Sequence, residues 1–214
     1  LFTGSLDRNP LIAGPGLHQL TGEAGRKLVE RAPFRFDFVN NVIYNYWNAS
    51  KTGLGAKVNF IGNIYKLGPD SSEGKPEIYL NPSGDDRPGW VTQVHCRGNL
   101  GPHRPRAGMD EFGIVMILAK ENLNGPNSRG PYGKGAERHL AREPFTTPKH
   151  ARLPIQTARE AYDAVLAHAG AWPRDAVDAR LVREVKEKKG AIGRVGPRWR
   201  KIYEEFQKKQ QEKK

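Results

Sequence analysis

The sequence predicts an all-β fold, and the strongest signal is a pair of strand-like segments, residues 34–46 and 56–66, rich in β-branched and aromatic side chains. Residues 41–44 (Asn-Val-Ile-Tyr) align with residues 63–66 (Asn-Ile-Tyr-Lys) at an offset of 22 residues. Self-similarity near this period is typical of stacked β coils, where an asparagine on one coil can share hydrogen bonds with the asparagine on the next. Two unrelated strands of an ordinary sheet explain the spacing equally well.

The composition favours a turn-rich fold, because the 214 residues include 24 glycines and 16 prolines. Hydrophobic residues make up 37%, and no run approaches the roughly 18 apolar residues that a membrane-spanning helix needs. The single cysteine, Cys96, excludes an internal disulfide framework. We interpret Cys96 as a packed strand residue, with a reactive thiol as the less favoured alternative.

The net charge of +12 is concentrated at the C-terminal end, where residues 183–214 contribute more than half of the excess. A basic surface attracts polyanions over long range, and both acidic polysaccharides and nucleic acids are polyanions. For the tail itself we favour a solvated segment without a partner.

Further elements follow along the chain. Shorter strands are expected at residues 76–80 and 90–97, and the Pro- and Gly-rich residues 121–154 are expected to be extended over the outside of the body. Thr157 and Glu160 form a capping-box pattern at the start of one amphipathic helix, and Asp175 is a suitable N-cap for a second. Both helices are expected to pack on an end or flank of the strands.

Several segments together resemble the pectate lyase family of polysaccharide lyases, and their order along the chain agrees with that family. The resemblance covers residues 1 to about 190. The segments are Leu1-Phe2, Asp7-Arg8-Asn9-Pro10, residues 36–45, 56–69, 98–102, 157–170 and 173–182.

The resemblance implies a right-handed parallel β-helix with C-terminal capping or flanking helices. Residues 1–120 would be coils, 121–154 the extended segment, 155–190 the helices and 191–214 a basic tail. It implies a secreted, monomeric enzyme that cleaves polygalacturonate (pectin) by β-elimination with Ca²⁺, and it implies neither a membrane nor a nucleic-acid partner. The coils that hold the calcium ligands would precede residue 1, so we expect the chain to be the C-terminal part of a longer enzyme.

Arg8 is the catalytic candidate, because the family's Arg-X-Pro position supplies the base that removes the C5 proton of the sugar. A guanidinium normally has a pKa above about 12, so this role needs calcium and substrate nearby to lower the pKa. The alternative is that Arg8 pairs with Asp7 and holds the loop. Pro10 is interpreted as a rigid turn that aims Arg8.

Three further residues are substrate-binding candidates. Lys57 and Lys66 flank the second strong strand and could bind uronate carboxylates, although ordinary surface lysines are the favoured alternative. Trp47 could stack on a sugar ring. The histidines show no paired zinc spacing, and no phosphate loop or nucleophile elbow occurs.

Two other functions stay open at this point. One is a non-catalytic β-helix that binds acidic polysaccharide through its basic side chains. The other is a basic nucleic-acid-binding protein, for which binding would weaken steeply with salt.

Overall fold

The structure, a computed structural model, describes residues 1–14, 23, 27, 34–72, 74–82, 91–118, 136–146 and 154–192. Most of the predicted extended segment at 121–154, and the predicted basic tail beyond residue 192, lie outside the described residues. No helix in the described part is long and apolar enough to cross a membrane.

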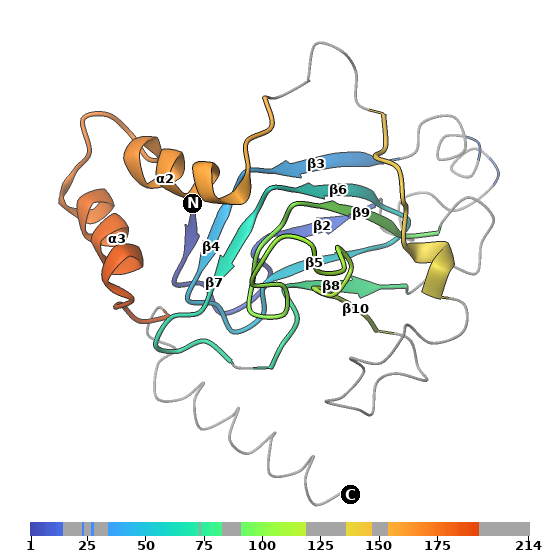
Figure 1. Ribbon diagram of the computed structural model, residues 1–214, viewed down its shortest axis with the longest axis horizontal. Helices are drawn as coiled ribbons and strands as arrows, with labels where there is room; N and C mark the ends of the chain where they lie inside the picture. The colour runs from blue at the N-terminus through green and yellow to red at the C-terminus, as the bar shows by residue number, and fades with distance from the viewer. Residues whose placement is uncertain are drawn as a thin grey trace, which may run out of the picture.

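The described strands form three sheets in which every pairing is parallel (Figure 1). With the exception of the pair β8 and β10, each strand pairs with the strand three places along the chain, so the chain visits the three sheets in turn. The first sheet holds β1 (Phe2–Thr3), β4 (Val42–Tyr44) and β7 (Ile64–Lys66); the second holds β2 (Leu11–Ala13), β5 (Ser50–Gly53), β8 (Ile78–Asn81) and β10 (Val115–Ile117); the third holds β3 (Arg35–Val39), β6 (Lys57–Ile61) and β9 (Gln93–Arg97).

The predicted offset of 22 residues is confirmed as the register of neighbouring strands, since Val42 lies opposite Ile64 and Phe38 opposite Phe60. The shared asparagine hydrogen bonds are confirmed as well. Asn41 Nδ2 donates to Asn63 Oδ1 over 3.1 Å, and Asn63 Nδ2 donates to Asn99 Oδ1 over 2.9 Å. The three asparagines therefore form a ladder that crosses three successive levels of the fold.

The two long predicted strands are each divided into two strands of different sheets. The first is interrupted at Asn40 and the second at Gly62, which have φ of 56° and 61°. This left-handed conformation is open to glycine and tolerated by asparagine, and it turns the chain out of the strand. The prediction that residues 34–46 and 56–66 are single strands is therefore wrong.

The main core lies between the sheets. It contains inward-facing residues of all three, among them Phe38, Ile43, Phe60, Leu80 and Val94, each at most 7% exposed. Neighbouring levels are also joined by aromatic contacts, with ring centroids of Phe38 and Phe60 5.7 Å apart. Cys96 continues this row on β9 and is 3% exposed, and burial raises the pKa of its thiol, so it is a packed strand residue as expected.

Two helices cover the outer face of the first sheet, α2 (Ala158–His168) and α3 (Ala176–Glu187) (Figure 1). The predicted capping box is confirmed, because Glu160 N donates to Thr157 Oγ1 and Thr157 N donates back to Glu160 Oε2. Asp175 caps α3 by accepting from Val177 N and Asp178 N. A 3₁₀ turn, η2 (Ala136–His139), lies beside β9.

The helices pack because the outer face of the first sheet is apolar. Val42 and Tyr44 alternate with the inward-facing Ile43, and they form a second core with Leu166 and Val185. Burying this face against helices makes the class mixed α/β. The prediction of an all-β right-handed parallel β-helix is therefore corrected to three parallel sheets combined with packed helices.

Candidate functional site

Arg8 lies on the surface in the turn before β2. Its Nε is 3.5 Å from Asp7 Oδ2, and the two side chains are 57% and 40% exposed. An ion pair this exposed contributes little stability. The loop is held instead by the buried Asn9, whose Nδ2 donates to Ser5 O and Asn48 O, while Pro10 O accepts from Lys51 N over 2.9 Å. Arg8 thus has the pairing that we named as the alternative to catalysis.

Lys57 and Lys66 are occupied by contacts inside the protein. Lys57 Nζ donates to Gln93 Oε1 over 2.8 Å and to the carbonyl of Val91. Lys66 Nζ donates to Tyr162 Oη over 2.9 Å and to Val185 O over 3.0 Å. Each of these two lysines therefore ties neighbouring segments to its strand, while Arg8 lies beside Asp7.

Lys66 joins β7 to both helices through its contacts with Tyr162 on α2 and Val185 on α3. A substitution at Lys66 tests whether these contacts hold the helices on the sheet. Replacing Lys66 by methionine keeps the length of the side chain but leaves the Val185 carbonyl and the Tyr162 hydroxyl without this donor. We expect the free energy of unfolding to fall by about 2 kcal/mol. Limited proteolysis should then cut faster within residues 158–187 than within the strands. Arg183→Ala, an exposed change on α3, is the control; unchanged cleavage in the Lys66 variant would show that the lysine does not hold the helices.

Trp47 belongs to a small cluster on the loop after β4. Lys75 Nζ lies 4.4 Å from the centroid of the Trp47 ring and donates to Asn48 Oδ1 over 3.0 Å. Burial lowers the pKa of Lys75 to about 8, although the nearby Asp7 carboxylate acts in the opposite direction. Lys75 was missed in the sequence because no spacing or motif distinguishes it from the other lysines.

A pocket of about 500 Å³ lies between the turns that follow β6 and β9 and the start of α2. Ile61, Leu100 and Ile155 form its apolar walls. Arginines contribute from three separate segments: Arg97 at the end of β9, Arg104 and Arg106 from the following loop, and Arg159 from α2. We call this the arginine pocket.

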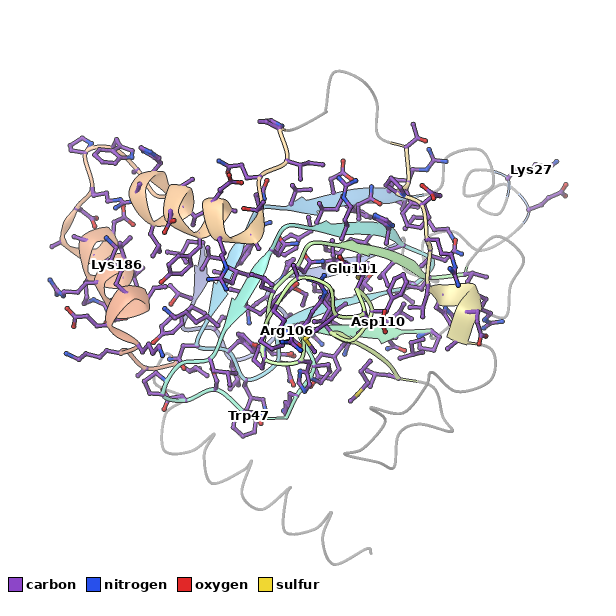
Figure 2. The ribbon with its side chains drawn as sticks, viewed as in Figure 1. Lys27, Trp47, Arg106, Asp110, Glu111 and Lys186 are labelled. Carbon is purple, nitrogen blue, oxygen red and sulfur yellow. The ribbon has the colours of Figure 1, made fainter. Side chains whose placement is uncertain are left out.

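Arg104 has a different role from the other arginines. It is 2% exposed, and its guanidinium donates to Asn99 O, to Met109 O over 3.2 Å and to Glu111 Oε1 over 2.7 Å. The second oxygen of Glu111 accepts from Gly98 N over 2.8 Å. Figure 2 shows Arg106 and Glu111 on this same loop region. Arg104 therefore fixes the loop that presents Arg106, and its charge is compensated.

Arg97, Arg106 and Arg159 are exposed, and none is in an ion pair with a carboxylate of the described residues. The wall that carries Arg159 is fixed to the sheets by Asn40. Asn40 Nδ2 donates to Gln156 O and Gln156 N donates to Asn40 Oδ1, each over 2.9 Å. The helix N-terminus itself is already occupied by Glu160, whose pKa is lowered by hydrogen bonds from Thr157. Among the described residues that line the pocket, the positive charges without an ion-pair partner are therefore those of the three arginines.

Among the described residues, no group of three His, Cys, Asp or Glu side chains is placed to hold a metal ion. Neither Asp7 beside Arg8 nor Glu111 beside Arg104 is part of such a group. The candidate sites in the described part of the chain consist of arginine, lysine and aromatic side chains.

Comparison of the sequence with known proteins finds a relative in riboflavin biosynthesis. No family model matches the chain. The chain is 29% identical over 168 residues to "Riboflavin biosynthesis protein RibD" from Actinobacillus pleuropneumoniae, a match that covers 78% of this chain and 39% of the relative. The chain thus spans about two fifths of the length of the curated relative that it matches.

This match contradicts the predicted membership of the pectate lyase family, because the relative is a protein of riboflavin biosynthesis. The polysaccharide lyase activity and the calcium cofactor, which followed from that membership, are corrected with it. The two alternatives, binding of acidic polysaccharide and binding of nucleic acid, gain no support. The site roles of Arg8, Pro10, Trp47, Lys57 and Lys66, and the secreted, monomeric state, stay untested predictions.

Proposed function

We propose that the arginine pocket binds a small anionic molecule that has an apolar body. The observation that carries the proposal is the convergence of Arg97, Arg106 and Arg159 from distant parts of the chain on one pocket with apolar walls. Small-molecule sites usually measure about 300–1,000 Å³ and combine apolar walls with a few polar groups that fix orientation. The arginine pocket has this composition and a size of about 500 Å³.

The anion is proposed because arginine stays charged at every physiological pH. Its planar fork of N–H donors matches the oxygens of a phosphate or carboxylate, and such paired contacts are stronger than neutral hydrogen bonds. Arg104 does not contribute a net charge, since Glu111 pairs with it at 2.7 Å. Three exposed guanidinium groups without a compensating carboxylate in the described residues remain to attract a ligand.

The relative directs the choice of ligand. Because it is a riboflavin biosynthesis protein, flavins are the first compounds to test. Riboflavin and flavin mononucleotide form a matched pair, since they share the flat ring system and differ by one phosphate group. A pocket of the proposed kind binds the mononucleotide and discriminates against riboflavin.

The test is a titration of each flavin with the protein, followed by the fluorescence of the ring system. We expect flavin mononucleotide to bind, and we expect Arg106→Ala to weaken that binding by about tenfold or more, which corresponds to the loss of one charged hydrogen-bonding partner. Arg183→Ala removes the same charge from α3, away from the pocket, and should leave the affinity within about twofold.

Equal binding of the two flavins would contradict the anion requirement. Absence of binding by either flavin would reject flavins as the ligand class, and the titration is then repeated with inorganic phosphate as competitor for a fluorescent aryl phosphate. Failure of that probe as well would reject the arginine pocket as an anion site.

A further inference from the structure

The arginine pocket holds more positive charge than a singly charged ligand compensates. Arg97, Arg106 and Arg159 line it, all three are exposed, and no carboxylate of the described residues forms an ion pair with any of them. A sulfate ester brings one negative charge to such a site, whereas a phosphate monoester, whose second pKa is about 6, brings two at pH 8. The additional charge is attracted by all three guanidinium groups, so the doubly charged head group is favoured.

Glu111 is a carboxylate held directly behind this pocket. Its Oε1 accepts from Arg104 Nη2 over 2.7 Å, and its Oε2 accepts from Gly98 N over 2.8 Å. Arg104 and Gly98 both line the pocket, whereas Glu111 is not among the lining residues. One negative charge is therefore bound to two residues of the wall, where it opposes the charge of an anion inside the pocket.

Two other carboxylates are close in sequence to these residues, and both are exposed. Glu160 accepts from Thr157 N and Oγ1 at the start of α2, and Asp110 Oδ1 accepts from Phe112 N over 3.1 Å. Neither of these carboxylates lines the pocket. Salt screens exposed charges strongly and partly buried charges much less. The side chain of Glu111 is 35% exposed, so its charge acts on the pocket with less screening.

We propose that the arginine pocket selects doubly charged head groups over singly charged ones, and that the Glu111 carboxylate sets the strength of this preference. The inference rests on the proposed function and deepens it by naming the charge of the ligand. Glu111 acts through Arg104 and Gly98 and is thus a positioning residue. Because it compensates Arg104, that arginine fixes the loop while the other three arginines meet the ligand.

The test uses phenyl phosphate and phenyl sulfate, which share an apolar ring and a tetrahedral head group and carry two and one negative charges at pH 8. Isothermal titration calorimetry gives the dissociation constant of each. We expect phenyl phosphate to bind about tenfold tighter or more, which corresponds to one further charged contact. Equal affinities, or tighter binding of phenyl sulfate, would overturn the inference and leave the anion site in place. Failure of both probes to bind would reject the anion site itself, and the inference with it.

Glu111→Gln separates the charge of this residue from its place in the loop. Glutamine keeps the length of the side chain and one carbonyl oxygen, and Arg104 keeps Asn99 O and Met109 O as acceptors. A fixed charge acts on a dianion with twice the energy that it has with a monoanion. We therefore expect the affinity to rise about tenfold for phenyl phosphate and about threefold for phenyl sulfate. Unchanged affinities, or equal changes for the two probes, as a loosened loop would produce, would overturn the role of Glu111.

Two further variants complete the design, and circular dichroism verifies that each variant is folded. Glu187→Gln removes an exposed carboxylate from α3, which contributes no residue to the pocket, and should change each affinity by less than about twofold. Arg106→Ala should lower the ratio of the two affinities by about twofold or more, because one of the three charges is gone. A ratio that Arg106→Ala leaves unchanged would overturn the inference, even if Glu111→Gln did not fold.

Discussion

Replacing Asn63 by alanine is expected to lower the free energy of unfolding by about 4 kcal/mol, the largest effect of any single change considered for this protein. Asn63 is completely buried, and its amide is fully used. Its Oδ1 accepts from the backbone N–H and the side chain of Asn41, and its Nδ2 donates to Phe38 O and Asn99 Oδ1, over 2.8 to 3.1 Å. Alanine removes these four hydrogen bonds inside the protein and keeps the backbone N–H of residue 63, which donates to Asn99 Oδ1 over 3.0 Å.

The measurement is urea unfolding followed by circular dichroism, with the midpoint and slope fitted separately. Asn41→Ala is the matched control, because Asn41 stands at the end of the ladder, is only half-buried and donates to Val39 O and Asn63 Oδ1 without a further asparagine above it in the described residues. We expect Asn41→Ala to lower the free energy of unfolding by about 1–2 kcal/mol. Equal costs for the two substitutions would show that burial and full pairing of Asn63 are not what stabilises this ladder.

Replacing Gly101 by alanine is expected to lower the free energy of unfolding by about 3 kcal/mol, because there is no space for the added methyl group. A Cβ atom at Gly101 would lie 2.3 Å from Glu77 Oε1 and 2.8 Å from Glu77 Cγ. Glu77 is itself completely buried, and its carboxylate accepts from His103 N over 2.9 Å and pairs with His103 Nδ1 at 2.8 Å. The methyl group therefore displaces a buried charge from its partner.

Gly98→Ala separates this crowding from ordinary backbone strain. Gly98 has a φ of +65°, and nothing lies within 4 Å of the position of its Cβ. Replacing Gly98 by alanine should lower the free energy of unfolding by about 1 kcal/mol, because the alanine must adopt the left-handed conformation. Thermal unfolding of both variants gives the comparison, and similar melting temperatures would contradict the crowding of Glu77.

The sequence predicted those features of the fold that are encoded locally or that repeat. The capping box of Thr157 and Glu160 acts within one turn, and the asparagines at 41 and 63 repeat with the strand register. Strand β5 was missed because Ser50-Lys-Thr-Gly53 has no apolar alternation. Ser50 is nevertheless buried, since its hydroxyl donates to Asn9 O over 2.8 Å and lies 3.0 Å from Tyr65 Oη.

The sites were harder to predict than the strands. A lysine that binds a ligand and a lysine that donates to a neighbouring carbonyl look alike in a sequence, and only the structure shows that Lys66 donates to Val185 O. The arginine pocket joins Arg97, Arg106 and Arg159, which no spacing rule connects. The helices on a flank of the strands were expected from the sequence. The division of the strands at Asn40 and Gly62 among separate parallel sheets, which exposes the apolar face that the helices cover, was not.

The first sheet separates two cores, one between the sheets and one beneath the helices, so the two cores need not unfold together. Ile43 and Tyr65 point to the core between the sheets, and Val42 and Tyr44 to the helices, so the helical layer can detach while the inter-sheet packing persists. Such a partly open molecule would expose the apolar face of the first sheet. It would bind hydrophobic dyes and self-associate while its strands are still formed. Mild heating should accordingly cause association at temperatures below the main melting transition.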